Sequence, residues 1–130
     1  SKLGKIYVMM SDGECQEGTT WESLLIGAKH KLDNIVVLVD YNKIQALTTL
    51  DEALPLHDLT AKFKAFNWTC SEVSDGHSFE EIISVLLEDN IKNKPRAIIV
   101  HTIKSCNGIL VQQDWKFPEL LSYDFAIICI

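Results

Sequence analysis

Apolar residues occur along this chain in two patterns that alternate. Ile35–Val39 is apolar and β-branched on both faces, and Lys5–Met10 and Ala97–Val100 are similar short apolar runs. Strands that are apolar on both faces are typical of parallel sheets covered by helices on both sides. A further strand is predicted at Trp68–Val73, which gives four strands in all.

Segments with helical spacing separate these strands. The first helix is expected to be capped by Thr19 or Thr20, and a second is expected over Leu56–Phe66. A third follows Ser78, where Glu81 three residues later completes the pattern of a capping box, and it runs to about Asp89. The first helix has apolar positions at Trp21, Leu24, Leu25, Ala28 and Leu32. The alternation predicts an α/β fold: a doubly wound parallel sheet with helices on both faces.

The remaining segments have weaker patterns. Residues 40–55 are predicted to be irregular, and Asp75-Gly76-His77 is predicted to form a turn. Residues 1–104 are expected to form the α/β domain, followed by a divergent segment, 105–130. Within that segment, an extended stretch is expected at Gly108–Gln112 and a turn at Trp115–Pro118. The apolar end, Phe125–Ile130, fits either a late edge strand or a truncated reading frame.

The charge balance narrows the classes of partner. Lys and Arg number 12 against 18 Asp and Glu, which gives a net charge of −6. Nucleic acid and anionic membranes both favour clustered cations, so neither is expected as a partner.

The sequence has no apolar run of membrane-spanning length and no signal peptide. It lacks an initiator Met, which favours a piece of a longer protein. The cysteines (15, 70, 106 and 129) have no CxxC spacing and are expected to be reduced thiols in a cytoplasmic protein.

Oxygen-bearing side chains follow two of the predicted strands. The first strand leads into Asp12-Gly13, and the second leads into Asp40-Tyr41-Asn42. A parallel βαβ unit returns the chain to the same edge of the sheet, so Asp12 and Asn42 are expected to face each other there. Carboxylate, amide and carbonyl oxygens suit Mg²⁺ (or Ca²⁺), and Gly13 lets a phosphate approach the backbone. Asp-Gly alone is more often a turn, but the partnered Asn42 favours a cation site.

The segment "SDGECQEGTTWESLLIGAKHKLDNIVVLVDYNKIQ" resembles the thiamine diphosphate motif of transketolases. That motif runs from Gly-Asp-Gly to an Asn about thirty residues later, after a buried strand, as Asp12 and Asn42 do here. The resemblance continues through "FKAFNW" and "DGHSFEE" to "PRAIIVHTIK", and so covers roughly Lys5–Lys104. It implies part of the thiamine diphosphate-binding fold.

Several residue roles follow from this resemblance alone. It implies that Asp12 and Asn42 are Mg²⁺ ligands, that the Ile44 carbonyl completes the protein contribution, and that the Gly13 amide meets the diphosphate. Glu17 matches a glutamate at the family's dimer contact, although a solvated residue in the first turn of a helix is an equal alternative. His101 lies at the same ligand edge, where a role near substrate or cofactor competes with a satisfied strand-end histidine. His77 is interpreted as a surface loop residue.

The resemblance implies a transketolase-like enzyme that transfers two-carbon ketol units between sugar phosphates in the pentose phosphate pathway. Thiamine diphosphate and Mg²⁺ are the implied cofactors. Three departures stand out: Ser11 replaces the first Gly of the motif, residues 105–108 disrupt a Gly-x-Gly, and no pyrimidine-binding domain is present. We therefore expect a pyrimidine-domain subunit or the remainder of a longer chain as partner, in a homodimer or heterotetramer. The alternatives are another thiamine diphosphate enzyme, of deoxyxylulose-phosphate synthase or decarboxylase type, or a truncated non-catalytic relative.

Overall fold

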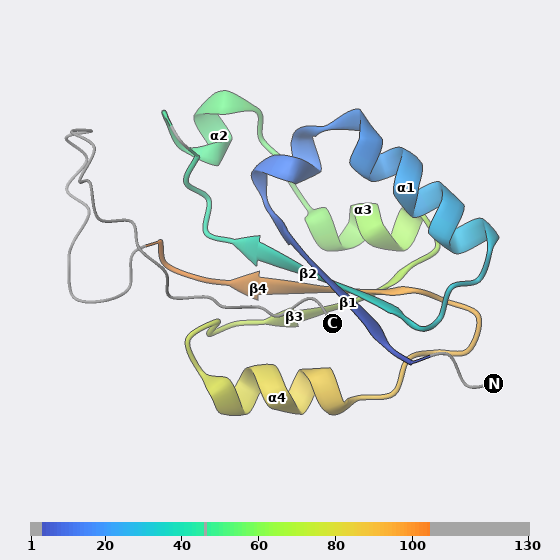
Figure 1. Ribbon diagram of the computed structural model, residues 1–130. Coiled ribbons are helices and arrows are strands. Elements are labelled where there is room, and N and C mark those ends of the chain that lie inside the picture. Colours follow the sequence, from blue (N-terminus) through green and yellow to red (C-terminus); the bar gives the residue numbers. More distant parts are fainter. Residues whose placement is uncertain (1–3, 46, 105–130) are drawn as a thin grey trace.

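A computed structural model describes residues 4–45 and 47–104 of the chain. Strands and helices alternate along it, as Figure 1 shows. The elements are β1 (Ile6–Ser11), the 3₁₀ helix η1 (Gly13–Gln16), α1 (Gly18–Lys29), β2 (Ile35–Tyr41), α2 (Leu50–Ala53), α3 (Leu59–Ala65), β3 (Thr69–Val73), α4 (Phe79–Leu87) and β4 (Arg96–His101).

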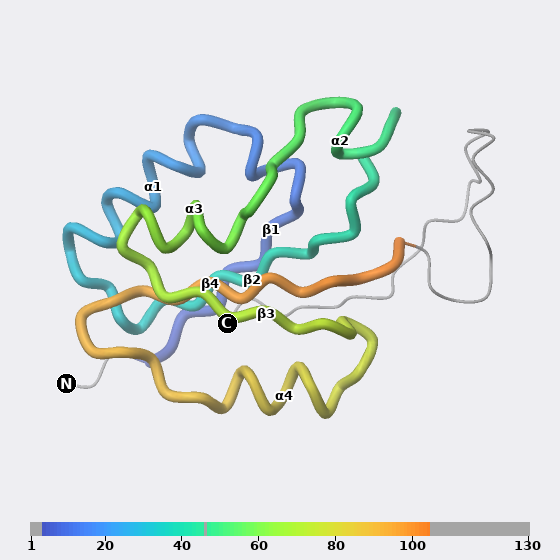
Figure 2. Tube along the Cα trace, turned by 180° about the vertical axis from the view of Figure 1, so that it is seen from behind, coloured from blue at the N-terminus to red at the C-terminus, as the bar shows by residue number. Residues whose placement is uncertain are grey.

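The four strands form one parallel sheet in the order β1-β2-β4-β3. Helices α1 and α3 cover one face of the sheet and α4 covers the other, which is visible from both sides in Figures 1 and 2. The predicted α/β fold, with a doubly wound parallel sheet, is therefore confirmed. Because all strands are parallel, their carboxyl ends meet at one edge of the sheet.

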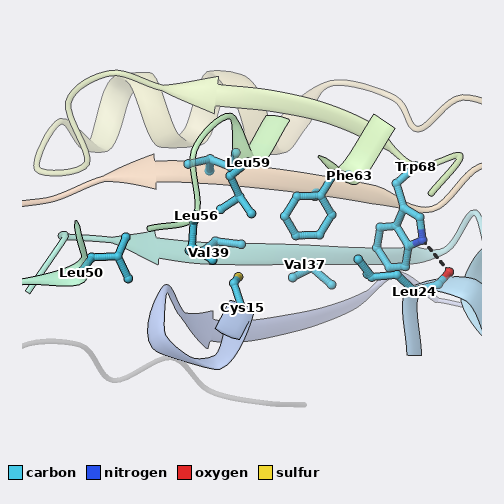
Figure 3. Close-up of a cluster of buried hydrophobic side chains, with 11 residues drawn as sticks. Cys15, Leu24, Val37, Val39, Leu50, Leu56, Leu59, Phe63 and Trp68 are labelled. Atoms are coloured by element: carbon cyan, nitrogen blue, oxygen red, sulfur yellow. Dashed lines mark hydrogen bonds between the residues drawn. The ribbon is translucent and has the colours of Figure 1, made fainter. Parts of the chain in front are cut away.

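Two apolar cores lie on the two faces of the sheet, and β2 contributes to both. Val37 and Val39 belong to the core under α1 and α3, whereas Val36 and Leu38 belong to the core under α4. This alternation explains why β2 is apolar at every position from 35 to 39. Figure 3 shows the larger core, in which Trp68 Nε1 donates a 2.9 Å hydrogen bond to the carbonyl of Leu24.

Two helices start at positions that differ from the sequence-based expectations. Helix α1 begins at Gly18 after Glu17 with no side-chain cap, so Thr19 and Thr20 are not its cap. The hydroxyl of Thr20 instead donates to the carbonyl of Glu14 (2.7 Å). The second helix begins at Leu59 and not at Leu56, because Asp58 caps it by accepting from the amide of Ala61.

The segment predicted to be irregular contains a short helix. Thr49 and Glu52 form a full capping box at the start of α2. Ile44 and Thr49 form an antiparallel bridge, which folds the chain after β2 back on itself.

The capping box predicted for α4 forms only in part. Ser78 accepts from the amide of Glu81 (3.2 Å), as expected. The carboxylate of Glu81, however, accepts from the amide and hydroxyl of Ser74 and from the amide of Asp75. Ser74 and Asp75, in the preceding turn, therefore bond to the Glu81 carboxylate in place of the Ser78 amide. The helix ends at Leu87, before the expected Asp89.

The expectations for residues 105–130, including Gly108–Gln112, Trp115–Pro118 and Phe125–Ile130, lie outside the described residues, as do Cys106 and Cys129. No helix within residues 4–45 and 47–104 has the length and apolar character needed to cross a membrane.

Candidate functional site

The tips of β1 and β2 are joined by hydrogen bonds at the carboxyl edge of the sheet. Ser11 is the register partner of Asp40, and the amide of Asp12 donates to the carbonyl of Asp40 (3.1 Å). The amide of Lys43 donates to Asp12 Oδ2 (2.7 Å). Lys43 has a left-handed φ of 62°, an uncommon conformation for a residue other than glycine. The structure thus brings the Asp12 carboxylate to the residue that follows Asn42.

Asp12 is buried, with only 2% of its surface exposed. Burial raises the pKa of its carboxyl group above the ordinary value, and the neighbouring Asp40 carboxylate raises it further. The amides of Lys43 and Gly13 and the charge of Lys104 oppose that rise in pKa without reversing it. A buried carboxylate of this kind is stabilised in its charged form when a cation binds beside it.

Asn42 and Ile44 place two further oxygens in the loop after β2. Asn42 Nδ2 donates to Asp40 Oδ2 (3.1 Å), which orients the amide, and its Oδ1 accepts from the amide of Ile44 (2.9 Å). The carbonyl of Ile44 accepts from Lys104 Nζ at 3.4 Å. Asp40, which was not predicted as a ligand, therefore orients Asn42.

The loop between β1 and α1 positions Gly13 and Glu17. A Cβ added to Gly13 would make ordinary van der Waals contacts with the side chains of Gln45 (3.7 Å) and Ser11 (3.8 Å). Glu17 is exposed at the start of α1 and borders a groove between β1 and α1. Ser11, which departs from the family motif, bonds through its amide and hydroxyl to the carboxylate of Glu14. This contact tightens the turn, and Asp12 stays at the strand tip.

His101 contacts the β3 side of the edge. Its Nε2 lies 3.0 Å from Glu72 Oε2, and its ring packs edge-on against Tyr41, with centroids 5.4 Å apart. Hydrogen bonds from Thr60 and then from His101 lower the pKa of Glu72. The partners of the His101 ring are thus Glu72 and Tyr41, and the ring is not joined to the Asp12 carboxylate.

Cys15 lies in η1, just before α1, but is not a candidate nucleophile. It is 1% exposed, and burial raises the pKa of its thiol to about 12. A thiolate is the reactive form of cysteine, so this thiol is inert near neutral pH.

Two features limit the kinds of site on the described chain. Residues 4–45 and 47–104 hold no cluster of three or more His, Cys, Asp or Glu side chains suited to a metal. The groove between β1 and α1 has a volume of about 440 Å³, and its lining is mostly apolar, including Val8, Met10, Ile26 and Leu32. The oxygens of Asp12, Asn42 and Ile44 near the strand tips lie outside the lining of this groove.

Sequence reasoning missed the residues that follow β4. The hydroxyl of Thr102 donates to Asp40 Oδ1, and Lys104 reaches the Ile44 carbonyl. His77 accepts a hydrogen bond from the amide of Ile103 (2.9 Å), so its interpretation as a plain surface loop residue is incomplete. The local sequence carries no signal for these contacts, because they depend on β4 lying beside β2 in the sheet.

Comparisons with known proteins identify the family of the chain. The family model "Transketolase, thiamine diphosphate binding domain" matches residues 3–113. The chain is 36% identical over 120 residues to the 6-deoxy-6-sulfo-D-fructose transketolase subunit SqwG of Clostridium sp. (strain MSTE9), covering 88% of this chain and 43% of that protein. It is 37% identical over 101 residues to an apulose-4-phosphate transketolase subunit of Phocaeicola vulgatus, covering 77% of this chain and 36% of that protein.

Solved structures show the same relationship. Transketolase from Campylobacter jejuni aligns with a TM-score of 0.69 and 31% identity over 76% of this chain, which is 15% of that protein. The chain thus spans less than half the length of the curated relatives it matches. It belongs to the transketolase family, a family of transferases, and corresponds to that family's thiamine diphosphate binding domain.

Proposed function

We propose that this chain binds thiamine diphosphate through a divalent cation held by Asp12, Asn42 and the carbonyl of Ile44. The buried Asp12 carboxylate, with its raised pKa, carries this proposal, because its charge lacks enough compensation within the chain. A carboxylate, an amide oxygen and a carbonyl form a hard donor set that fits Mg²⁺. Ca²⁺ accepts the same donors at longer distances, so Mg²⁺ is the first ion to test and Ca²⁺ the second.

Gly13 directly follows Asp12 beyond the tip of β1 and carries no side chain, which supports approach of the diphosphate to the backbone there. Lys104 places a positive charge at the same edge, which favours an anion bound together with the cation. When bound, thiamine diphosphate would supply the nucleophilic carbon for transfer of a two-carbon ketol unit between sugar phosphates. The residues of this chain hold and orient its diphosphate end.

Catalysis is proposed to need more polypeptide than this chain provides. Its relatives include proteins named as transketolase subunits, and it spans less than half their length. Ile6, Val8, Leu25 and Ile26 are apolar and between 41% and 58% exposed, which supports contact with further polypeptide. We place the pyrimidine-binding function in a partner subunit or in the remainder of a longer chain, with a dimer or heterotetramer as the working assembly.

In this proposal residues 1–104 are the binding domain, and Glu17 and His101 are candidates for contact with the partner and with substrate. The described thiols, Cys15 and Cys70, are unpaired, which supports a reducing compartment such as the cytoplasm. The pentose phosphate pathway is the proposed setting.

Calorimetry with Mg²⁺ and thiamine diphosphate tests the binding proposal. Asp12→Ala should weaken cofactor affinity by about a hundredfold or more, because it removes the one charged ligand. Asp89→Ala removes an exposed carboxylate that follows α4 and should leave the affinity unchanged. Circular dichroism checks that both variants fold. Equal affinity in Asp12→Ala and wild type would remove Asp12 from the site.

A transfer assay then separates the candidate activities. With a pyrimidine-domain subunit supplied, ketol transfer between sugar phosphates is the expected result. Cofactor binding without any transfer would instead identify a non-catalytic relative, and decarboxylation or deoxyxylulose phosphate formation would identify another enzyme of the same cofactor class.

A further inference from the structure

The turn between β3 and α4 packs tightly against the end of β4. The amide of Gly76 donates to the carbonyl of His101 (2.7 Å). A Cβ on Gly76 would lie 2.6 Å from a Thr102 methyl carbon and 2.7 Å from the His101 carbonyl oxygen. Only glycine therefore allows the turn to approach β4 so closely.

His77 extends this contact to the residues after β4. Its own amide donates to Asp75 Oδ1 (2.9 Å), which closes the turn. Its Nε2 accepts from the amide of Ile103 (2.9 Å). An imidazole that accepts at Nε2 is neutral and has its proton on Nδ1. His77 thus forms a directional bond to a segment 26 residues away, although its side chain is exposed.

The segment held by His77 reaches the strand-tip site. Next to Ile103, the hydroxyl of Thr102 donates to Asp40 Oδ1, and its amide donates to the carbonyl of Tyr41 (3.4 Å). The other oxygen of Asp40, Oδ2, accepts from Asn42 Nδ2 (3.1 Å). A continuous series of contacts therefore leads from His77 through Thr102 and Asp40 to Asn42.

We propose that His77 is a positioning residue for the cation site: its bond to the Ile103 amide fixes Thr102, which holds Asp40 so that Asn42 presents its oxygen to the ion. This inference rests on the proposed function for its effect on cofactor binding. The bond from the Ile103 amide joins His77 to the chain beyond β4, whereas the contacts within its own turn do not require it.

Two conservative substitutions separate these roles. The side-chain oxygen of Gln lies at nearly the position of Nε2, so His77→Gln keeps an acceptor for the Ile103 amide. The shorter His77→Asn keeps the amide chemistry but does not reach that position. His30→Ala, at the exposed carboxyl end of α1, is the control for loss of a surface histidine.

Calorimetry with Mg²⁺ and thiamine diphosphate should show about threefold to tenfold weaker affinity for His77→Asn. His77→Gln and His30→Ala should bind within about twofold of wild type, which is the scatter expected for substitutions that keep or do not touch the contact. Equal affinity for His77→Asn and wild type, or an equal loss in both His77 variants, would overturn the positioning role. In either of those cases the wild-type protein still binds, so the proposed function stands.

A second measurement does not depend on the cofactor. In ¹⁵N NMR spectra of the cofactor-free protein, the Asn42 side-chain amide should shift in His77→Asn but not in His77→Gln or His30→Ala. An Asn42 signal that is unchanged in His77→Asn would overturn the inference. If the wild-type protein binds no cofactor while this shift is present, the proposed function fails and the link from His77 to Asn42 stands.

Discussion

The carboxyl edge of the sheet and the β1–α1 flank differ in what holds them together. At the edge, hydrogen bonds join polar groups of β1, β2 and β4, such as Asp12 to Lys43 and Thr102 to Asp40. On the flank, the groove between β1 and α1 is mostly apolar, and Ile6 and Ile26 remain 46% and 58% exposed. The hydrogen bonds of the candidate site are therefore made within the chain, whereas the flank has exposed apolar side chains.

The difference follows from the order of the strands. β2 and β4 lie inside the sheet, so their ends have neighbours on both sides, and the residues that follow them contact one another. β1 has a strand partner, β2, on one side only among the described residues. An edge strand with apolar residues and no charged residue between Ile6 and Ser11 favours pairing with further polypeptide. In our proposal, binding chemistry and assembly belong to different sides of this domain.

Asp12→Asn is expected to give the largest effect and to act on the edge alone. The amide keeps an acceptor for Lys43 but removes the charge, so cofactor affinity should fall by about a hundredfold or more. Stability should rise at neutral pH, because the buried carboxylate no longer has to ionise. Calorimetry and urea unfolding measure the two changes, which have opposite signs.

The stability of the wild-type protein should depend on pH through Asp12. Its pKa is raised in the folded protein above the ordinary value of 3.8, so the folded state binds the proton more tightly than the unfolded state. Its favourable contribution is therefore full below pH 3.8 and is lost as the pH rises through the folded pKa. Wild type should lose stability relative to Asp12→Asn over that range. A difference between the two proteins that does not change with pH would contradict this account.

Gly76→Ala should have the next largest effect, again at the edge. The new methyl group would lie within 2.7 Å of His101 and Thr102 atoms, so it should destabilise the fold by about 1–3 kcal/mol. Gly18→Ala is the matched control, because nothing lies within 4 Å of its added Cβ. Urea unfolding of both variants measures the difference. Equal stability would show that the turn can move away from β4 at little cost.

Local patterns predicted the strands and the meeting of the β1 and β2 ends at one edge of the sheet, because both follow from rules that apply to short segments. A buried strand is recognisable from its own residues, and a parallel crossover returns the chain to the same edge. The sequence also held the signal for α2, since Thr49 and Glu52 have capping-box spacing, but that segment was predicted to be irregular.

The contacts of His77 and Thr102 could not be predicted in the same way. They depend on β4 lying between β2 and β3, and the order of strands is not encoded in the apolar pattern of any one of them. The partner of Glu81 was missed for a related reason. Its carboxylate accepts from Ser74, seven residues earlier, and the capping-box spacing to Ser78 carries no signal for that contact.

Ile26→Gln is expected to give the smallest effect and tests the flank directly. Ile26 is 58% exposed on α1, so its replacement should change the free energy of unfolding by no more than about 0.5 kcal/mol. Cofactor affinity should be unchanged, because the groove and the strand-tip oxygens are separate sites. Leu24→Ala, at a position 3% exposed on the same helix, should cost about 2–5 kcal/mol and is the buried counterpart.

Urea unfolding measures both substitutions on α1. A loss above about 2 kcal/mol in Ile26→Gln would place that side chain in the core, because surface changes rarely cost so much. The apolar side chains of the flank would then be buried within the chain, just as the polar groups of the edge are hydrogen-bonded within it. A near-neutral result, with binding to the remaining transketolase polypeptide reduced, would instead show that the flank's apolar surface serves assembly. In both substitutions the new residue has a helix propensity at least as high as the original, so a loss of stability at either position reports lost burial and not lost propensity.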